Sequence, residues 1–347
     1  MYMDFEEMQK NQNKEEPISV NPFERGEIRT DYRTGLKSVF AVSRKNRPVD
    51  YVTSEAIEDK GREYCPFEPE KYELNKTFFE IGNPCRVRVI YNKYPQLDCS
   101  AVQAHESDDI FERFSYYGFS LVIIDSREHG QRFEQFNANN IRDLADAILE
   151  AERRVYTNDG IDFVYLNKNF GRKSSGTLSH SHWQTLGYGY ADIPEIVRLR
   201  LKKTLEFREK RGQCLLEYAA GAETQRKLLE NSSAIAFAPF AQLYTGESVV
   251  MPKRHVSMLS ELESDELSGM LSACKEIVAA NDEYFGTHAY NILGYSLRKE
   301  HAFHACIEIV PRVSEIGPMQ MAGYYGSSIT PEEYSRSIRS IISQRHE

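Results

Sequence analysis

Apolar positions along the chain follow two periods, and each period predicts one kind of element. Short apolar runs predict strands, and they lie at 37–42, 86–91, 119–124, 163–166, 248–251, 289–293 and 305–310. Apolar residues that recur every three or four positions predict helices over 141–154 and 265–280. The charged segment 196–230 has the same helical period, and we interpret it as a connector between two halves of the chain.

The order of these elements repeats along the chain. In the first half a strand leads to His129, a helix and a strand follow, and the segment ends at His180. In the second half the same succession leads from His255 to His304. The two intervals are 51 positions (180 − 129) and 49 positions (304 − 255), which indicates an internal duplication whose copies have diverged.

Residues 180–184 read His-Ser-His-Trp-Gln and give the strongest indication of chemistry. In an extended segment His180 and His182 point to the same side, so their imidazoles can share a site. A neutral imidazole nitrogen is a nucleophile near pH 7, and its attack on phosphorus gives a phosphoramidate. Gln184 can donate a side-chain N–H to a phosphate oxygen. Alone, such a histidine pair more often marks a metal site or an ordinary strand end.

The preceding residues 169–177 support a phosphate site. They are rich in glycine, hydroxyl and basic residues and follow a predicted strand, as a phosphate-cradling loop does. Asn169 lies 11 positions before His180 (180 − 169). With these features the chain resembles the galactose-1-phosphate uridylyltransferase family of the histidine-triad superfamily, over residues 29–340. The family's motif is His-Pro-His-Gly-Gln, so Ser181 and Trp183 depart from it.

The resemblance implies roles for individual residues. The second histidine of the motif is the family's nucleophile and corresponds to His182, while the glutamine corresponds to Gln184. Arg44 and Arg47 would contact phosphate, although a solvated basic turn is the alternative interpretation of these arginines. The other implied substrate contacts are Asn92 and Asn169 to the nucleoside. In the mechanism that we expect, Thr177 and Gln184 would stabilise the charge of the phosphate.

The resemblance also implies a metal site. Members of the family often hold a structural zinc ion, and the corresponding residues are Cys65, Glu68, His129 and His180. A carboxylate is an accepted zinc ligand, but Glu68 stands where the family has a second cysteine. A metal-free site held by hydrogen bonds is therefore the alternative.

A second metal site, present in some members, is expected to be absent from this chain. Tyr295 and Cys306 stand where that site needs histidines. We therefore expect His255 and His304 to serve the repeated fold rather than the chemistry.

The fold implied by the resemblance is α+β, with two fused histidine-triad-like halves in which helices pack on antiparallel sheets. We predict a flexible N-terminal tail over 1–28, an N-terminal half with the nucleophile over 29–195, and a connector helix with the C-terminal half over 196–347. Because such halves pack into one body, the boundary near residue 195 is a soft one.

The function implied is a nucleotidyltransferase with a covalent nucleotidyl-His182 intermediate. It would transfer UMP or AMP between a nucleoside diphosphate sugar and a sugar phosphate. Tyr325 replaces a family glutamate that binds sugar hydroxyls, so galactose is not assumed as the substrate. Two alternatives stay open: a phosphorylase or hydrolase of the histidine-triad type, and a non-catalytic nucleotide-binding protein.

Composition narrows the partners. The formal net charge of −9 argues against general attraction to nucleic acid or anionic membranes, while a local cluster of basic side chains and backbone N–H groups could still hold a small anionic ligand. The resemblance implies that these ligands are nucleotide sugars and sugar phosphates. No apolar run approaches the roughly 18 residues of a membrane span. The 6 cysteines are scattered without a framework spacing, which favours a reduced, cytoplasmic protein. A homodimer is an implication of the resemblance alone.

Overall fold

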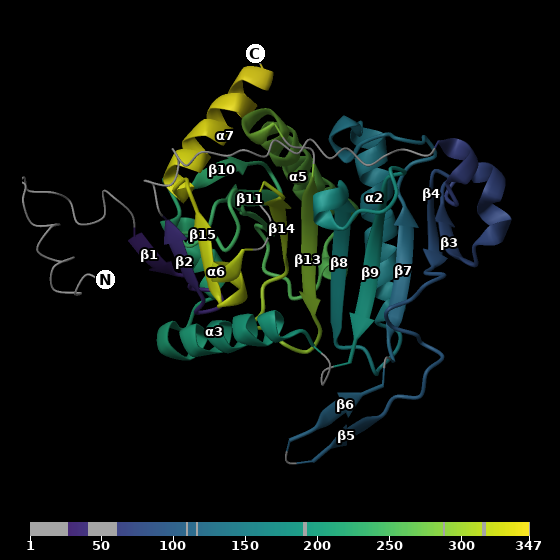
Figure 1. The fold of residues 1–347 in the computed structure, drawn as a ribbon, viewed down its shortest axis with the longest axis horizontal. Helices are drawn as coiled ribbons and strands as arrows, with labels where there is room; N and C mark the ends of the chain where they lie inside the picture. The colour runs from purple at the N-terminus through teal and green to yellow at the C-terminus, as the bar shows by residue number, and fades with distance from the viewer. Residues whose placement is uncertain are drawn as a thin grey trace, which may run out of the picture.

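The structure is a computed structural model that describes residues 27–40, 61–108, 110–115, 117–189, 193–286, 289–313 and 317–346 (Figure 1). Two predicted phosphate contacts, Arg44 and Arg47, lie outside the described residues. So does the predicted tail up to residue 26, while Glu27 and Ile28 begin the first strand.

One antiparallel sheet of 10 strands runs through the molecule in the order β10-β11-β12-β14-β13-β8-β9-β7-β4-β3 (Figure 1). Its strands are β3 (Thr77–Ile81), β4 (Val87–Tyr91), β7 (Phe119–Ile124), β8 (Phe163–Phe170), β9 (His182–Tyr188), β10 (Lys227–Glu230), β11 (Ala234–Phe237), β12 (Ser248–Pro252), β13 (Tyr290–Leu297) and β14 (Cys306–Pro311). The two halves meet where β8 pairs with β13, from Phe163 opposite Leu297 to Phe170 opposite Tyr290. The halves therefore share one sheet.

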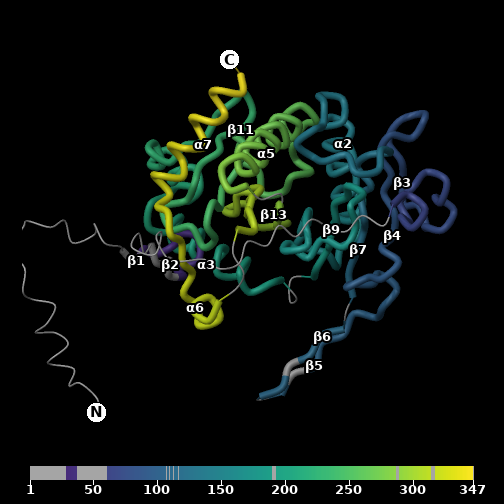
Figure 2. The backbone as a smooth tube through the Cα atoms, turned by 45° about the horizontal axis from the view of Figure 1, so that its top comes forward, coloured from purple at the N-terminus to yellow at the C-terminus, as the bar shows by residue number. Residues whose placement is uncertain are grey.

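Two smaller sheets accompany the large one. The first joins β1 (Glu27–Thr30), β2 (Lys37–Phe40) and β15 (Tyr324–Ser327), with β15 parallel to β2. The second is the hairpin of β5 (His105–Ser107) and β6 (Glu112–Phe114), which projects from the body in both views (Figures 1 and 2). The N-terminal strands thus complete a sheet with the C-terminal part of the chain.

Helices cover both faces of the large sheet. They are α2 (Ala138–Val155), α3 (Glu195–Arg211), α4 (Leu215–Ala222), α5 (Ser264–Phe285), α6 (Pro318–Met321) and α7 (Pro331–Arg345). Short 3-10 turns lie at η2 (Arg62–Tyr64), η3 (Pro69–Leu74), η4 (Phe133–Gln135), η5 (Arg172–Ser174) and η7 (Leu259–Glu261). In Figure 2, α2, α5 and α7 lie together along one side of the sheet.

The two faces bury alternate residues of each strand. Val164 and Leu166 pack into the larger core with α2, α5 and α7, while Phe163 and Tyr165 pack toward α3 and α4. This alternation follows from the two-residue period of a strand. A strand buried on both faces needs an apolar run, which explains why the sequence shows one at most central strands.

The sequence predicted much of this architecture. The structure confirms the α+β class with antiparallel sheets and packed helices. A helix or strand lies at each predicted element except part of the connector, and residues 41–42 of the predicted strand 37–42 lie outside the described residues. The connector is helical only to residue 222, and the helical interpretation is wrong for β10. There Asn231 accepts bonds from the backbone N–H groups of Ser233 and Ala234, and the resulting turn favours a hairpin over a helix. The division at residue 195 stays a prediction.

Two findings bear on the environment of the chain. Within the described residues, none of the helices combines the length and the apolar character needed to cross a membrane. All 6 cysteines of the chain are free. The cytoplasmic location stays a prediction.

Glu152 of α2 is a buried carboxyl that joins the two halves. It accepts hydrogen bonds from the backbone N–H of Ser260 at 3.0 Å, from the Ser260 hydroxyl at 2.9 Å and from the Ser296 hydroxyl at 3.0 Å. Burial raises the pKa of Glu152 from 4.5 to about 7, although these bonds oppose the shift. The folded state therefore holds this proton more tightly than the unfolded state.

We predict a pH-dependent gain in stability for Glu152→Gln. The raised folded pKa contributes stability that is present below pH 4.5 and is lost as the pH rises through about 7. The free energy of unfolding of the variant should match that of the wild type at pH 5 and exceed it at pH 8 by on the order of 2–3 kcal/mol, at about 1.4 kcal/mol per pH unit, with a correspondingly higher Tm at pH 8. Thermal unfolding at both pH values measures this. Glu73→Gln, at an exposed position, is the control, and equal differences at both pH values would contradict the prediction.

Candidate functional site

His182 is the first residue of β9 and lies at an unusual point of the sheet. On one side it pairs with Ile124 of β7. On the other side the ladder between β8 and β9 ends at Asn167 opposite Gln184, two positions before His182 is reached. His182 and Gln184 share one face, and Trp183 points into the core on the other.

The imidazole of His182 is held in one orientation. Its Nδ1 donates to the backbone carbonyl of His180 at 2.9 Å, since a carbonyl can only accept. The ring edge of Phe67 packs against it at 5.2 Å between centroids. Burial lowers the pKa of His182 to about 4, the bond to His180 opposes this, and the nearby Lys168 charge lowers it further. At neutral pH the ring is therefore uncharged, and its Nε2 carries a lone pair suited to nucleophilic attack.

An array of amides lies on the same face as His182. Asn167 is opposite Gln184, and Asn169 follows two positions later on β8. Across the junction of the halves, Asn291 donates to Asn169 Oδ1 at 2.6 Å and to the Ser174 carbonyl at 3.0 Å. Asn167 and Asn291 were missed in the sequence. The signal available was the alternate spacing of Asn167 and Asn169 on one strand face.

The predicted phosphate loop turns sharply after β8. Gly171 has a φ of 86°, and a Cβ there would lie 2.7 Å from the Cβ of Ala289, so the turn requires glycine. The backbone N–H of Gly176 donates to the Gly171 carbonyl at 3.1 Å and closes the loop. Thr177 is exposed at the end of this loop.

Asn92 lies farther from the nucleophile than the other predicted contacts. It follows β4, which is two strands from β9 in the sheet order. Its backbone N–H donates to the Ser120 carbonyl, and its side chain accepts from the N–H of Tyr94 at 2.9 Å. Ile90 pairs with Val122, which pairs with Gln184, and Asn92 is two positions after Ile90. Asn92 therefore belongs to the face of the sheet that carries Gln184.

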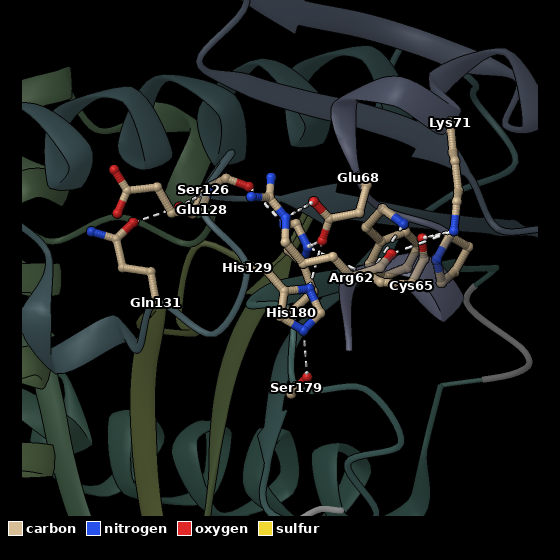
Figure 3. Close-up of polar contacts among 12 residues, drawn as sticks. Arg62, Cys65, Glu68, Lys71, Ser126, Glu128, His129, Gln131, Ser179 and His180 are labelled. Atoms are coloured by element: carbon tan, nitrogen blue, oxygen red, sulfur yellow. Dashed lines mark hydrogen bonds and ion pairs between the residues drawn. The ribbon is translucent and has the colours of Figure 1, made fainter. Parts of the chain in front are cut away.

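The four predicted metal ligands come together in the fold (Figure 3). The donor atoms of Cys65, Glu68, His129 and His180 all lie within 4.8 Å of one another. Nε2 of His180 donates to the Ser126 carbonyl at 2.8 Å, so its Nδ1 lone pair faces Cys65 Sγ at 3.5 Å and Glu68 Oε1 at 3.2 Å. A lone pair and a carboxylate oxygen at this distance need a proton or a cation between them.

A second cluster of the same kind lies in the C-terminal half, formed by Cys214, Glu217, His255 and His304. Nε2 of His304 donates to the Pro252 carbonyl at 3.2 Å, and its Nδ1 faces Cys214 Sγ at 3.5 Å. Nδ1 of His255 lies 3.0 Å from Glu217 Oε1. The expectation that the two histidines are only structural did not consider Cys214 and Glu217. The signal was the repeated spacing Cys-x-x-Glu at 65–68 and 214–217.

Both donor sets fit a divalent metal ion. Thiolate, imidazole and carboxylate are all accepted zinc ligands, and four donors complete a tetrahedral shell. The backbone carbonyls of Ser126 and Pro252 accept hydrogen bonds from His180 and His304 and so orient their rings, as such carbonyls commonly do at zinc sites. Such closed shells have no open position for a substrate, which makes them suitable for a structural rather than a catalytic ion. Tyr295 and Cys306, which the sequence analysis excluded as ligands, are buried outside both clusters.

The described part of the C-terminal half has no histidine that corresponds to His182. Counting from His304 as from His180, Cys306 corresponds to His182 and Glu308 corresponds to Gln184. Glu308 is buried and forms ion pairs with Arg33 at 2.5 Å and Arg200 at 2.8 Å. Among the described residues, the C-terminal half therefore has a buried ion-pair cluster at the positions that correspond to His182 and Gln184.

Comparisons with known proteins agree with this geometry. No family model matches the chain. It is 26% identical over 333 residues to ADP-glucose phosphorylase of Arabidopsis thaliana, covering 91% of this chain and 93% of that protein. It is 23% identical over 287 residues to galactose-1-phosphate uridylyltransferase of Thermotoga maritima, covering 78% and 85% of the two chains.

Solved structures show the same fold. A crystal structure of ADP-glucose phosphorylase from Arabidopsis thaliana with bound ADP-glucose matches with a TM-score of 0.77 at 22% identity, over 90% of this chain and 98% of that one. A structure of uridylyltransferase matches with a TM-score of 0.71 at 23% identity, over 91% of this chain and 98% of that one. The resemblance inferred from the motif is confirmed: the chain is a divergent relative of the galactose-1-phosphate uridylyltransferase-like proteins.

Proposed function

We propose that this chain is a nucleotidyltransferase that acts through a covalent nucleotidyl-His182 intermediate. The observation that carries the proposal is the state of the His182 ring, which donates from Nδ1 to the His180 carbonyl and keeps a neutral Nε2 for attack. The relatives at similar length are named as enzymes that act on a nucleotide sugar or a sugar phosphate.

The transfer consists of two displacements at phosphorus. Nε2 of His182 attacks the α-phosphorus of a nucleoside diphosphate sugar, and the bond to the bridging oxygen breaks. The sugar phosphate leaves with the electron pair. An acceptor phosphate oxygen then attacks the same phosphorus, and the bond to Nε2 breaks, which restores the neutral imidazole. UMP or AMP is thereby carried from one phosphate to another.

The surrounding donors are proposed to hold the nucleotide. The side-chain amide of Gln184, next to His182 on the same face, and the hydroxyl of Thr177 would donate to phosphate oxygens. Asn169 and Asn92 would contact the nucleoside. Arg44 and Arg47 are also proposed as phosphate contacts from the motif alone.

A second candidate function is a phosphorylase, with inorganic phosphate as the acceptor. It is supported by the 26% identical relative, which is named ADP-glucose phosphorylase. It is also supported by Tyr325 of β15, whose ring packs edge-on against Tyr244 at 5.5 Å and offers no carboxylate to a sugar. Hydrolysis, with water as the acceptor, is the simplest variant of the same chemistry.

We further propose that both four-residue clusters bind zinc. The soft thiolate in each set and the two imidazoles favour this ion over magnesium or calcium. In this role zinc would stabilise the fold around residues 65–68 and 214–217. A homodimer stays a prediction.

The covalent intermediate can be observed directly. After incubation with UDP-glucose or ADP-glucose, intact-mass spectrometry of the wild-type protein should show an added UMP or AMP. His182→Asn should show no adduct, because the amide lacks the nucleophilic nitrogen. His346→Asn, which changes an exposed C-terminal histidine, should keep the adduct.

The acceptor follows from a second addition to the loaded protein. Release of the adduct by a hexose 1-phosphate, by inorganic phosphate or by buffer alone identifies a transferase, a phosphorylase or a hydrolase. A wild-type protein that never acquires the adduct, or a His182→Asn protein that does, would falsify the proposed function. Multiple turnover that depends on His182 would exclude the non-catalytic alternative.

Metal content gives an independent prediction. Elemental analysis of the purified wild-type chain should find two zinc ions, and removal by a chelator should lower the Tm. Cys65→Ser and Cys214→Ser should each lose one ion, because each removes the thiolate of one cluster. Cys85→Ser, outside both clusters, should keep two. A wild-type chain that stays metal-free after dialysis against zinc would contradict the prediction.

A further inference from the structure

A buried charged group lies directly behind the nucleophile. Lys168 of β8 is 1% exposed, and its ammonium is on the core side of the sheet, opposite the face that carries His182. A lysine this deeply buried is costly unless each of its donors has a partner. Its partners therefore indicate why it is there.

The three N–H groups of Lys168 have three acceptors. Nζ lies 3.1 Å from Asp125 Oδ2, 2.6 Å from the Ser181 hydroxyl and 3.3 Å from the backbone carbonyl of His182. The Ser181 hydroxyl in turn donates to Asp125 Oδ2 at 3.0 Å, and Trp183 Nε1 donates to the same oxygen at 2.8 Å. Lys168, Asp125, Ser181 and Trp183 thus form one connected unit, which we call the Lys168 network.

The network stands where backbone pairing stops. The ladder between β8 and β9 ends at Asn167 opposite Gln184, so the backbone of His182 is paired only with β7. The bond from Lys168 to the His182 carbonyl spans this gap with a side chain. The orientation of the imidazole depends on that backbone, because its Nδ1 is bonded to the carbonyl of His180.

The composition of the network matches the departures of the chain from the motif. Ser181 and Trp183 are the two residues that replace proline and glycine between and after the histidines. Both bond to Asp125, which is 1% exposed and compensates the charge of Lys168. The two departures therefore serve one arrangement rather than two unrelated ones.

We propose that Lys168 is a positioning residue for nucleotidyl transfer at His182: through Asp125, Ser181 and the His182 carbonyl it fixes the backbone that aims the nucleophile. The inference rests on the proposed function. In this role Lys168 does not contact the substrate. Loss of the Lys168 ammonium should therefore slow the attack on phosphorus and leave binding of the nucleotide sugar nearly unchanged.

The test is single-turnover formation of the His182 adduct by Lys168→Met over a range of nucleotide sugar concentrations. The maximal rate constant should fall by about 10- to 100-fold, as expected for a misplaced nucleophile, while the half-saturating concentration changes by less than about threefold. Asp125→Asn/Lys168→Met removes both charges together and should show the same split. This double variant decides the matter if Lys168→Met alone does not fold.

Trp183 supplies a readout that is separate from activity. It is the single tryptophan of the chain, fully buried, with the Lys168 ammonium 5.3 Å from its ring. Its fluorescence should change in both variants. Tyr334→Phe is the control, because it removes buried hydrogen bonds to Ser248 and Asn281 in another part of the core. It should lower the Tm but leave the fluorescence and the rate constant unchanged.

The outcomes separate the inference from the function. If the wild type forms no adduct, the proposed function fails and the inference falls with it. If the wild type forms it and Lys168→Met does so equally fast, only the inference is overturned. The inference is also overturned if Lys168→Met raises the half-saturating concentration of nucleotide sugar and leaves the maximal rate constant unchanged. The same holds if Tyr334→Phe lowers the rate constant as much as Lys168→Met does, or if the Trp183 fluorescence of Lys168→Met equals that of the wild type.

Discussion

The pairing of β8 with β13 is the constraint on which the rest of the structure depends. Eight residues of each strand pair in one continuous antiparallel register, from Phe163 opposite Leu297 to Phe170 opposite Tyr290. This pairing turns two half-sheets into one and leaves neither central strand as an exposed edge. It also sets Asn169 opposite Asn291, so the amide array beside His182 is complete only when both halves are joined.

The two halves use the same framework for different purposes. Each has a Cys-x-x-Glu segment and two histidines. The second histidine is oriented by a backbone carbonyl: His180 by that of Ser126 and His304 by that of Pro252. Beyond these positions they diverge. Where the first half has a neutral imidazole and an amide, the second has a buried thiol and Glu308, which Arg33 neutralises. A buried carboxylate held by guanidinium groups resists displacement, so the C-terminal half is suited to support the fold, while the proposed reaction is confined to the N-terminal half.

The sequence predicted the elements with strong periodicity and the residues that a motif specifies. It brought Cys65, Glu68, His129 and His180 together correctly as a group, although they are far apart in the chain. It did not reveal β9 as a strand, because its polar and aromatic residues lack a simple apolar run. Lys168 was equally hidden: nothing in a linear pattern shows that a lysine next to two asparagines is buried. Its burial depends on Asp125 and Ser181, which only the fold brings near.

The cluster of Cys65, Glu68, His129 and His180 is also linked to His182 through packing. Phe67 lies between Cys65 and Glu68 in the sequence. Its ring packs edge-on against the imidazoles of His180 and His182, with 6.1 Å and 5.2 Å between the ring centroids. Fixing Cys65 and Glu68 therefore fixes the apolar wall against which the imidazole rests. In the second half the equivalent residue, Leu216, packs in the same buried cluster as Cys306. In each half the repeated segment thus closes one side of the residue two positions after the second histidine of the cluster, and in the N-terminal half that residue is His182, the proposed nucleophile.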